Sequence, residues 1–228
     1  MDFVIDGWDL PSVPAAGSAD RFPVRRIYCI GRNYAAHALE MGSDLREPPL
    51  FFLKPSDAVV RGDDTTIPYP PKASKFHYEG ELVVAIGTGG RDIPEASAND
   101  HIYRYGLGLD MTRRDLQGAA RDKGRPWDMG KGFDKSAPCG AIVTASKIGH
   151  PDKGTIRLKV NGEERQTSDL SDMIWNVPES IAYLSGLVEL QSGDLIYTGT
   201  PEGVGAVVSG DVIEVHVDGV GDLKVTIE

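Results

Sequence analysis

The dipeptide Asn161–Gly162 separates two segments in which apolar and polar residues alternate. Both residue types accept the positive φ angles of a two-residue hairpin turn, so the pair predicts a β-hairpin between residues 156–160 and 163–167. A second alternating pair, residues 212–217 and 223–227, surrounds Asp218–Gly219. The carboxyl-terminal half of the chain is therefore predicted to be rich in antiparallel β-structure.

The rest of the sequence consists of short apolar or β-branched runs separated by turn-forming residues. Residues 1–22 show little periodicity, so we expect an extended arm that packs on a single domain over residues 23–228. Strands are predicted at residues 24–31, 50–53 (expected to be buried), 59–60, 82–86, 105–110, 141–144 and 195–197. Helices are predicted at residues 33–42, with Asn33 as amino-terminal cap, and at 94–105, 115–123 and 177–184. Together they predict an α+β, mainly β fold: a rolled mixed sheet or sandwich with a few short helices.

Length and charge limit the partners that this chain can bind. At 228 residues it can bury one sizeable core, and its 34 acidic against 24 basic residues give a net charge of −10. No run of lysine and arginine is long enough to track phosphates, so neither nucleic acid nor an anionic membrane is expected as a partner. Cys29 and Cys139 lack a metal-binding spacing and are expected to be buried free thiols. We expect a cytoplasmic protein without a signal peptide or a membrane-spanning segment.

Two glutamates precede an apolar strand pattern. Glu79 and Glu81 flank Gly80 directly before the run at residues 82–86. Side chains alternate along a strand, so both carboxylates are predicted to lie on one face, roughly 6–7 Å apart. Asp110 ends the next predicted strand. Three carboxylates at the ends of neighbouring strands suit a hard divalent cation such as Mg²⁺ or Mn²⁺, whereas the alternative is a set of solvated acids at the rim of a sheet.

Three further residues can take part in catalysis. His37 and Glu40 share a face of the predicted helix, where the carboxylate can orient the imidazole as a general base, although such pairs are also common on helix surfaces. Lys131, close to two glycines, can neutralise a substrate carboxylate or a developing oxyanion, or can equally be a solvated loop lysine. The glycines around Thr200 favour close approach of backbone amides to a small anion. No nucleophilic serine or cysteine motif is found, so a covalent hydrolase is not expected.

Five separated motifs together resemble the fumarylacetoacetate hydrolase family in their order and spacing. They are IGRNYAAH (residues 30–37), EGEL (79–82), GLDMTRRD (108–115), KGFD (131–134) and TGTPEGVG (198–205), and the match runs from about residue 24 to the carboxyl terminus. Within the family the chain is most similar to bacterial members that cleave fumarylpyruvate in the gentisate pathway and to the related acylpyruvases. The segments FPVRRIYC (22–29) and RPWD (125–128) add to that similarity.

The resemblance implies a β-rich homodimer with a small oxo acid as substrate. It implies that Mg²⁺ or Mn²⁺ is held by Glu79, Glu81 and Asp110. It also implies a catalytic His37–Glu40 dyad, on a segment that becomes ordered when substrate binds, and a catalytic role for Lys131.

The resemblance also indicates residues of the substrate pocket. Arg114, Gln117 and Thr200 match substrate-lining positions of the family. A carboxylate at the far end of the substrate needs a cationic partner, for which Arg114 is the first choice and Arg32 the second. His77 follows a phenylalanine where relatives often carry a second histidine, so its role is left open.

The implied reaction is hydrolysis of a carbon–carbon bond in a 2,4-dioxo acid, fumarylpyruvate to fumarate and pyruvate. Water activated by His37 adds to the C4 carbonyl, and the C3–C4 bond breaks to leave the enolate of pyruvate, which the metal and Lys131 stabilise. An acylpyruvase and an oxaloacetate decarboxylase are alternatives that pass through the same enolate, and the decarboxylase needs no activated water. A non-catalytic domain with structural carboxylates is the third possibility.

Overall fold

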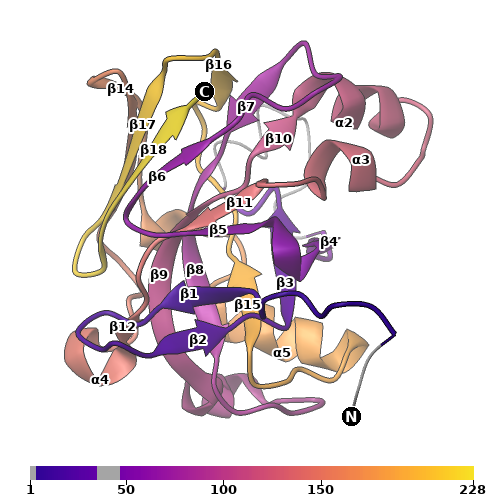
Figure 1. Ribbon diagram of the computed structural model, residues 1–228. Helices are drawn as coiled ribbons and strands as arrows, with labels where there is room; N and C mark the ends of the chain where they lie inside the picture. Colours follow the sequence, from indigo (N-terminus) through magenta and orange to yellow (C-terminus); the bar gives the residue numbers. More distant parts are fainter. Residues whose placement is uncertain (1–3, 35–46) are drawn as a thin grey trace.

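The computed structural model of the chain describes residues 4–34 and 47–228, whose regular secondary structure is mainly β-sheet (Figure 1). Within these ranges the largest sheet has eight strands in the order β4-β3-β15-β8-β9-β11-β5, with β12 paired to β9. These strands are β3 (Arg26–Gly31), β4 (Leu50–Lys54), β5 (Val59–Arg61), β8 (Gly80–Ile86), β9 (Ile102–Leu109), β11 (Ala137–Cys139), β12 (Val143–Thr144) and β15 (Asp194–Tyr197). The sheet is mixed, because β15 pairs with β3 in parallel and with β8 in antiparallel orientation.

A second sheet of five strands has the order β14-β13-β17-β18-β6. Its strands are β6 (Asp64–Ile67), β13 (Thr155–Val160), β14 (Glu163–Asp169), β17 (Val212–Val217) and β18 (Gly221–Ile227). The predicted hairpin is confirmed: Asn161 and Gly162 join β13 to β14 with φ angles of 53° and 80°. The predicted β17–β18 pair around Gly219 is also confirmed.

Two small sheets and several short helices complete the described part of the chain. The small sheets contain β1 (Ser12–Pro14) with β2 (Arg21–Pro23), and β10 (Thr112–Arg113), β7 (Phe76–Tyr78) and β16 (Gly205–Val207). The α-helices are α2 (Arg114–Arg121), α3 (Asp128–Lys131), α4 (Ala145–Ile148) and α5 (Val177–Leu187), and the 3₁₀ helices are Ser56–Ala58, Glu95–His101 and Leu170–Asp172. None of these helices is long and apolar enough to cross a membrane.

Strand β8 is buried on both faces and separates two hydrophobic cores. Leu82 and Val84 point into a core shared with Leu158 of β13 and other residues of the five-stranded sheet. Val83, on the other face, lies in a second core with Val13 of the amino-terminal arm. This two-sided burial explains the uninterrupted apolar run of β8. The predicted mainly β, α+β fold with a mixed sheet is confirmed.

Two predicted elements differ in the structure. Residues 94–105 were expected to form a helix, but Glu95–His101 is a 3₁₀ helix and β9 begins at Ile102. The strand at residues 50–53 was expected to be buried, but β4 is an edge strand of the large sheet, and the Leu53 side chain is 50% exposed. An apolar run therefore marks a strand without showing whether both of its sides are covered.

The helix predicted at residues 33–42 lies outside the described residues except for its first two positions, so the role of Asn33 as its amino-terminal cap stays a prediction. The described contacts of the Asn33 side chain join it to other segments. Its amide nitrogen donates to the carbonyl oxygens of Trp175 and Thr198 at 2.9 and 2.7 Å, and its Oδ1 accepts from Trp175 N at 2.8 Å. This buried side chain therefore holds the segment after β15 close to β3.

Candidate active site

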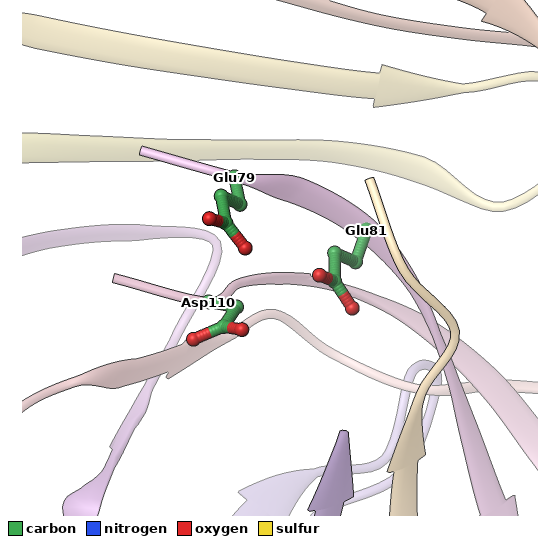
Figure 2. Close-up of side chains that lie close together, drawn as sticks. All are labelled: Glu79, Glu81 and Asp110. Carbon is green, nitrogen blue, oxygen red and sulfur yellow. The ribbon is translucent and has the colours of Figure 1, made fainter. Parts of the chain in front are cut away.

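Glu79, Glu81 and Asp110 form one buried cluster at the ends of β8 and β9. Figure 2 shows their carboxyl groups turned toward a common centre, and one oxygen of each lies within 4.8 Å of the others. The strand register produces this arrangement, because Gly80 pairs with Leu109 and Asp110 N donates to Glu79 O at 2.9 Å. The prediction from alternating side chains thus gave the correct three neighbours, and the reading as solvated acids at a sheet rim is wrong.

Three cationic side chains surround the acids. Lys131 Nζ donates to Glu79 Oε2 at 2.7 Å and to Asp110 Oδ2 at 2.6 Å. Arg114 donates to Glu79 Oε1, and Lys54 Nζ lies 2.8 Å from Asp110 Oδ1. Lys131 comes from the end of α3, Arg114 from the start of α2 and Lys54 from the end of β4. Three acidic side chains therefore lie among three cationic ones.

The two glutamates differ in their electrostatic environment although one residue separates them. Burial alone would raise the pKa of Glu79, but Lys131 and Arg114 outweigh it and hold the pKa well below its ordinary value. Burial raises the pKa of Glu81, and repulsion from Asp110 and Glu79 raises it further. Burial would lower the pKa of Lys131, but Asp110 and Glu79 reverse the shift, so the lysine is cationic.

The donor set fits a hard divalent cation. Asp110 Oδ1 is buried and accepts no hydrogen bond among the described residues, since its contact with Lys54 lacks hydrogen-bond geometry. Glu81 forms no ion pair within the described part of the chain, and the charge of Lys131 does not offset burial and the repulsion from its two acidic neighbours. Carboxylate oxygens are preferred ligands of Mg²⁺ and Mn²⁺. A cation at the centre of the cluster would remove both deficits.

The loop after β15 supports Glu81 from the side. Gly199 has a φ of +96° and donates its backbone N–H to Glu81 Oε2 at 2.8 Å. A Cβ at this position would lie 2.6 Å from the Asn33 Cβ, so only glycine fits. The amide that was expected to approach a small anion thus binds a carboxylate of the protein itself. Thr200 Oγ1 donates to Gly80 O at 3.0 Å and accepts from Gln166 Nε2 at 2.9 Å.

A cavity of about 340 Å³ opens onto the cluster. Its wall includes four residues expected to contact substrate: Arg32, Arg114, Gln117 and Thr200. Glu79, Glu81 and Lys131 form its polar floor, and Phe52 and Trp127 contribute aromatic side chains. The residues that the sequence nominated from five separate segments therefore face one space.

The remaining two predicted catalytic residues, His37 and Glu40, lie outside the described residues. Their proximity to the cavity thus stays a prediction.

The sequence did not indicate Lys54. Its side chain is fully buried, and its Nζ donates to Met111 O at 3.0 Å and to the carbonyl oxygen of Lys131. Lys54 follows the apolar run of a strand and directly precedes a proline, and this position is the feature of the sequence that could have indicated its burial.

His77 also lines the cavity, which the sequence left open. Its Nδ1 lies 3.4 Å from Arg114 Nε. Burial, and then the charge of Arg114, lower the pKa of His77 to about 4, so the imidazole is neutral at physiological pH. A neutral ring here can accept a hydrogen bond from Arg114.

Comparison with known proteins gives the family. A family model described as "Fumarylacetoacetate (FAA) hydrolase C-terminal" matches residues 26–228. Fumarylpyruvate hydrolase from Ralstonia sp is 49% identical over 181 residues, which cover 79% of this chain and 93% of that protein. Oxaloacetate tautomerase FAHD1 from Rattus norvegicus is 44% identical over 204 residues, 90% of this chain and 92% of that protein.

A solved structure agrees with both fold and sequence. The crystal structure of fumarylpyruvate hydrolase from Pseudomonas aeruginosa in complex with Mn²⁺ and pyruvate is 51% identical, with a TM-score of 0.97, and the match covers 99% of each chain. The acid cluster, the lysine beside it and the glycine loop thus lie in a fold that is shared along the whole chain. The chain belongs to the fumarylacetoacetate hydrolase family.

Proposed function

We propose that the chain is a metal-dependent hydrolase that cleaves the C3–C4 bond of a 2,4-dioxo acid, with fumarylpyruvate as substrate. The charge balance of the cluster carries this proposal. Three buried carboxylates face the three cations Lys54, Lys131 and Arg114, so one bound divalent cation leaves an excess of two positive charges. Such a site favours a small substrate with a carboxylate and a developing enolate at the same end. The similarity to fumarylpyruvate hydrolases from two bacteria supports the choice of substrate.

The cofactor that we propose is Mg²⁺ or Mn²⁺, held by Glu79, Glu81 and Asp110. When bound, this ion would act as a Lewis acid that polarises the 2-oxo group of the substrate. The protein's own residues provide the rest. Lys131, kept cationic by two acids, places a positive charge beside the oxygen on which the enolate charge develops.

The hydrolytic step assigns roles to the His37–Glu40 dyad. In this proposal His37 removes a proton from water while Glu40 stabilises the resulting imidazolium. The hydroxyl adds to C4, the C3–C4 bond breaks, and its electron pair stays with C3 as the enolate of pyruvate. A proton then returns to C3, and fumarate and pyruvate are the products.

A comparison of substrates tests the proposal. Protein freed of metal with a chelator is assayed with fumarylpyruvate, acetylpyruvate and oxaloacetate, with and without added Mg²⁺ or Mn²⁺. We expect metal-dependent release of equal amounts of fumarate and pyruvate, with fumarylpyruvate having the highest kcat/KM. A preference for acetylpyruvate would indicate a general acylpyruvase instead.

The second candidate is a reaction of oxaloacetate at the same site. The observation in its favour is the 44% identity to a protein named oxaloacetate tautomerase. Oxaloacetate presents the same carboxylate and 2-oxo group, and both its tautomerisation and its decarboxylation pass through an enol or enolate without water addition. Faster turnover of oxaloacetate than of either dioxo acid would favour this reading.

We also propose a cytoplasmic homodimer that acts in gentisate catabolism. Cys29 and Cys139 are buried free thiols, as expected for a reducing compartment. Edge strand β4 exposes Leu50 and Leu53, and the amino-terminal arm exposes Trp8, which together offer an apolar surface to a second copy. Light scattering coupled to size exclusion should give twice the mass of 24.6 kDa, and Leu53→Glu should lower it. A monomeric wild-type protein at micromolar concentration would contradict the dimer.

A further inference from the structure

Arg121 contributes a cation to the cavity wall far from the acid cluster. It is the last residue of α2, and its side chain is 48% exposed, whereas the side chain of Glu79 on the cavity floor is 8% exposed. The cavity therefore runs from a buried acidic end to an outer end that carries Arg121. The bond cleavage proposed above, at the acid cluster, gives this arginine no role.

Helix α2 carries a row of polar side chains between these two ends. Arg114, Gln117 and Arg121 are spaced three and four residues apart, so they share one helix face, and all three line the cavity. Arg114 is already engaged, since it donates to Glu79, to Gln117 Oε1 at 2.6 Å and to His77 Nδ1 at 3.4 Å. It therefore belongs to the acid end of the site and is poorly placed to bind a second, distant carboxylate.

Two aromatic side chains contribute apolar surface to the cavity wall. Phe52 and Trp127 lie with their ring centroids 5.9 Å apart, and both line the cavity. Gly118 on α2 leaves open space, since a Cβ there would meet nothing within 4 Å. An unsaturated acyl chain suits this aromatic surface better than a strongly hydrated one.

We propose that Arg121 binds the distal carboxylate of the acyl group and so determines the preference for a dicarboxylic dioxo acid. The inference rests on the proposed function. Along the helix axis Arg121 lies about 10 Å from Arg114. The two carboxylate carbons of fumarylpyruvate are separated by six bonds, about 7 Å when extended, as in two residues of backbone. The flexible arginine side chain covers the remaining distance.

The present partner of Arg121 does not prevent this role. Its Nε and Nη2 both lie 3.2 Å from Asp122 Oδ1, in an ion pair whose two side chains are 48% and 67% exposed. Exposed ion pairs contribute little free energy, so a substrate carboxylate held at its other end can replace Asp122. The planar guanidinium can bind that carboxylate in bidentate fashion, which a lysine cannot.

The test uses the ratio of kcat/KM for fumarylpyruvate to kcat/KM for acetylpyruvate, which lacks the distal carboxylate. We expect Arg121→Met to lower this ratio about 10- to 100-fold, the range of a hydrogen bond to a charged group. Arg121→Lys should fall between wild type and Arg121→Met. Lys123→Met removes the same charge two residues away, from a side chain outside the cavity wall, and should leave the ratio unchanged.

A binding measurement separates this inference from the proposed reaction. Calorimetry with fumarate, in the presence of Mn²⁺ and pyruvate, should show weaker binding to Arg121→Met than to wild type by the same factor. A wild-type protein that cleaves neither dioxo acid would overturn the proposed reaction, while the fumarate titration would still test Arg121. An unchanged ratio in Arg121→Met, an equal drop in Lys123→Met, or a drop found only in Arg32→Met would overturn the assignment to Arg121.

Discussion

Two glutamates separated by a single residue can have pKa values shifted in opposite directions. Glu79 accepts from Lys131 and Arg114, which hold its pKa down, whereas Glu81 accepts from the neutral Gly199 amide and faces two acids. Glu79 is thus ionised in the metal-free protein, while Glu81 tends to keep a proton. The cluster is therefore poised to exchange that proton for a cation.

Replacement of Glu81 by glutamine should change metal binding more than stability. An acid whose pKa is raised in the folded state adds stability below its unfolded pKa and loses it as pH rises through the folded pKa. Metal-free wild type should therefore lose stability above about pH 4.5, the ordinary glutamate value, and Glu81→Gln should lack this loss. Urea unfolding in EDTA between pH 5 and 8 should show the stability of the variant relative to wild type rising with pH, within about 1–2 kcal/mol.

The same variant should lose turnover and the thermal stabilisation by Mn²⁺, because one of three anionic ligands is gone. Full activity at unchanged metal affinity would exclude Glu81 from the metal site.

Removal of the Lys54 ammonium group should destabilise the fold strongly. Lys54→Met leaves Asp110 with less compensation and deprives two buried carbonyl oxygens of a donor, so we expect a loss of about 3–5 kcal/mol. Lys224→Met is a matched control, since Lys224 pairs with Asp64 at 3.1 Å on the surface, where such pairs contribute no more than about 1 kcal/mol. Equal losses in the two variants by urea denaturation would contradict the structural role of Lys54.

Among single residues, the sequence correctly predicted those whose neighbours follow from the alternation of side chains along a strand and from the position where a strand ends. Alternation along β8 placed Glu79 and Glu81 on one face, and the end of β9 placed Asp110 beside them. Lys54 could not be predicted in the same way, because its carbonyl partners lie 57 and 77 residues further along the chain. Only the folded chain brings them together.

At the scale of elements, the contact between α2 and α3 sets the position of Lys131. The Cβ that an alanine would place at position 130 lies 2.8 to 2.9 Å from backbone and side-chain atoms of Gln117. Figure 1 shows the two helices side by side next to β10. The glycine therefore permits the close approach that brings Lys131 over the acids.

Gly130→Ala should separate the two helices and displace Lys131. We expect a stability loss of about 1–3 kcal/mol from overpacking, together with a lower kcat. Met129→Ala, at an exposed position of the same helix, should change stability by no more than about 0.5 kcal/mol and serves as the control. Thermal unfolding and steady-state rates of both variants check the prediction, and a Gly130→Ala protein with wild-type kcat would refute it.

The helix predicted at residues 94–105 failed for a reason that belongs to this scale. Pro94 and the small polar residues after it are compatible with a helix start, and they do form a 3₁₀ helix. The segment from Ile102 to Leu109 instead forms β9, which pairs with β8. The pairing of β9 with β8 therefore outweighed the local preference for a helix. The hairpins at Gly162 and Gly219 had no such competition, because each of them pairs two strands that are adjacent in the sequence.

At the scale of the whole molecule, the fold class could be predicted from the turn-forming residues and from the alternation of apolar and polar residues. The arrangement of the sheets in layers could not be predicted in this way. The five-stranded sheet and the amino-terminal arm cover opposite faces of β8, and no local pattern specifies which segment covers which face. The same scaffold is also shared by proteins named for different reactions, fumarylpyruvate hydrolysis and oxaloacetate tautomerisation. The fold therefore does not by itself specify the reaction, which has to be argued from the residues of the site.

The last prediction separates the two reactions within this one chain. Hydrolysis of a dioxo acid needs an activated water, whereas decarboxylation of oxaloacetate only needs the electron pair of the breaking bond to be stabilised. If His37 and Glu40 act as a base and its orienting partner, His37→Asn and Glu40→Gln should slow hydrolysis about 10²- to 10⁴-fold, the usual contribution of a positioned acid–base group. Decarboxylation should fall much less, because it relies on the acid cluster and Lys131. His216→Asn, on β17 and outside the cavity wall, controls for the loss of a histidine as such. Equal losses in both reactions would mean that the dyad shapes the pocket and does not activate water.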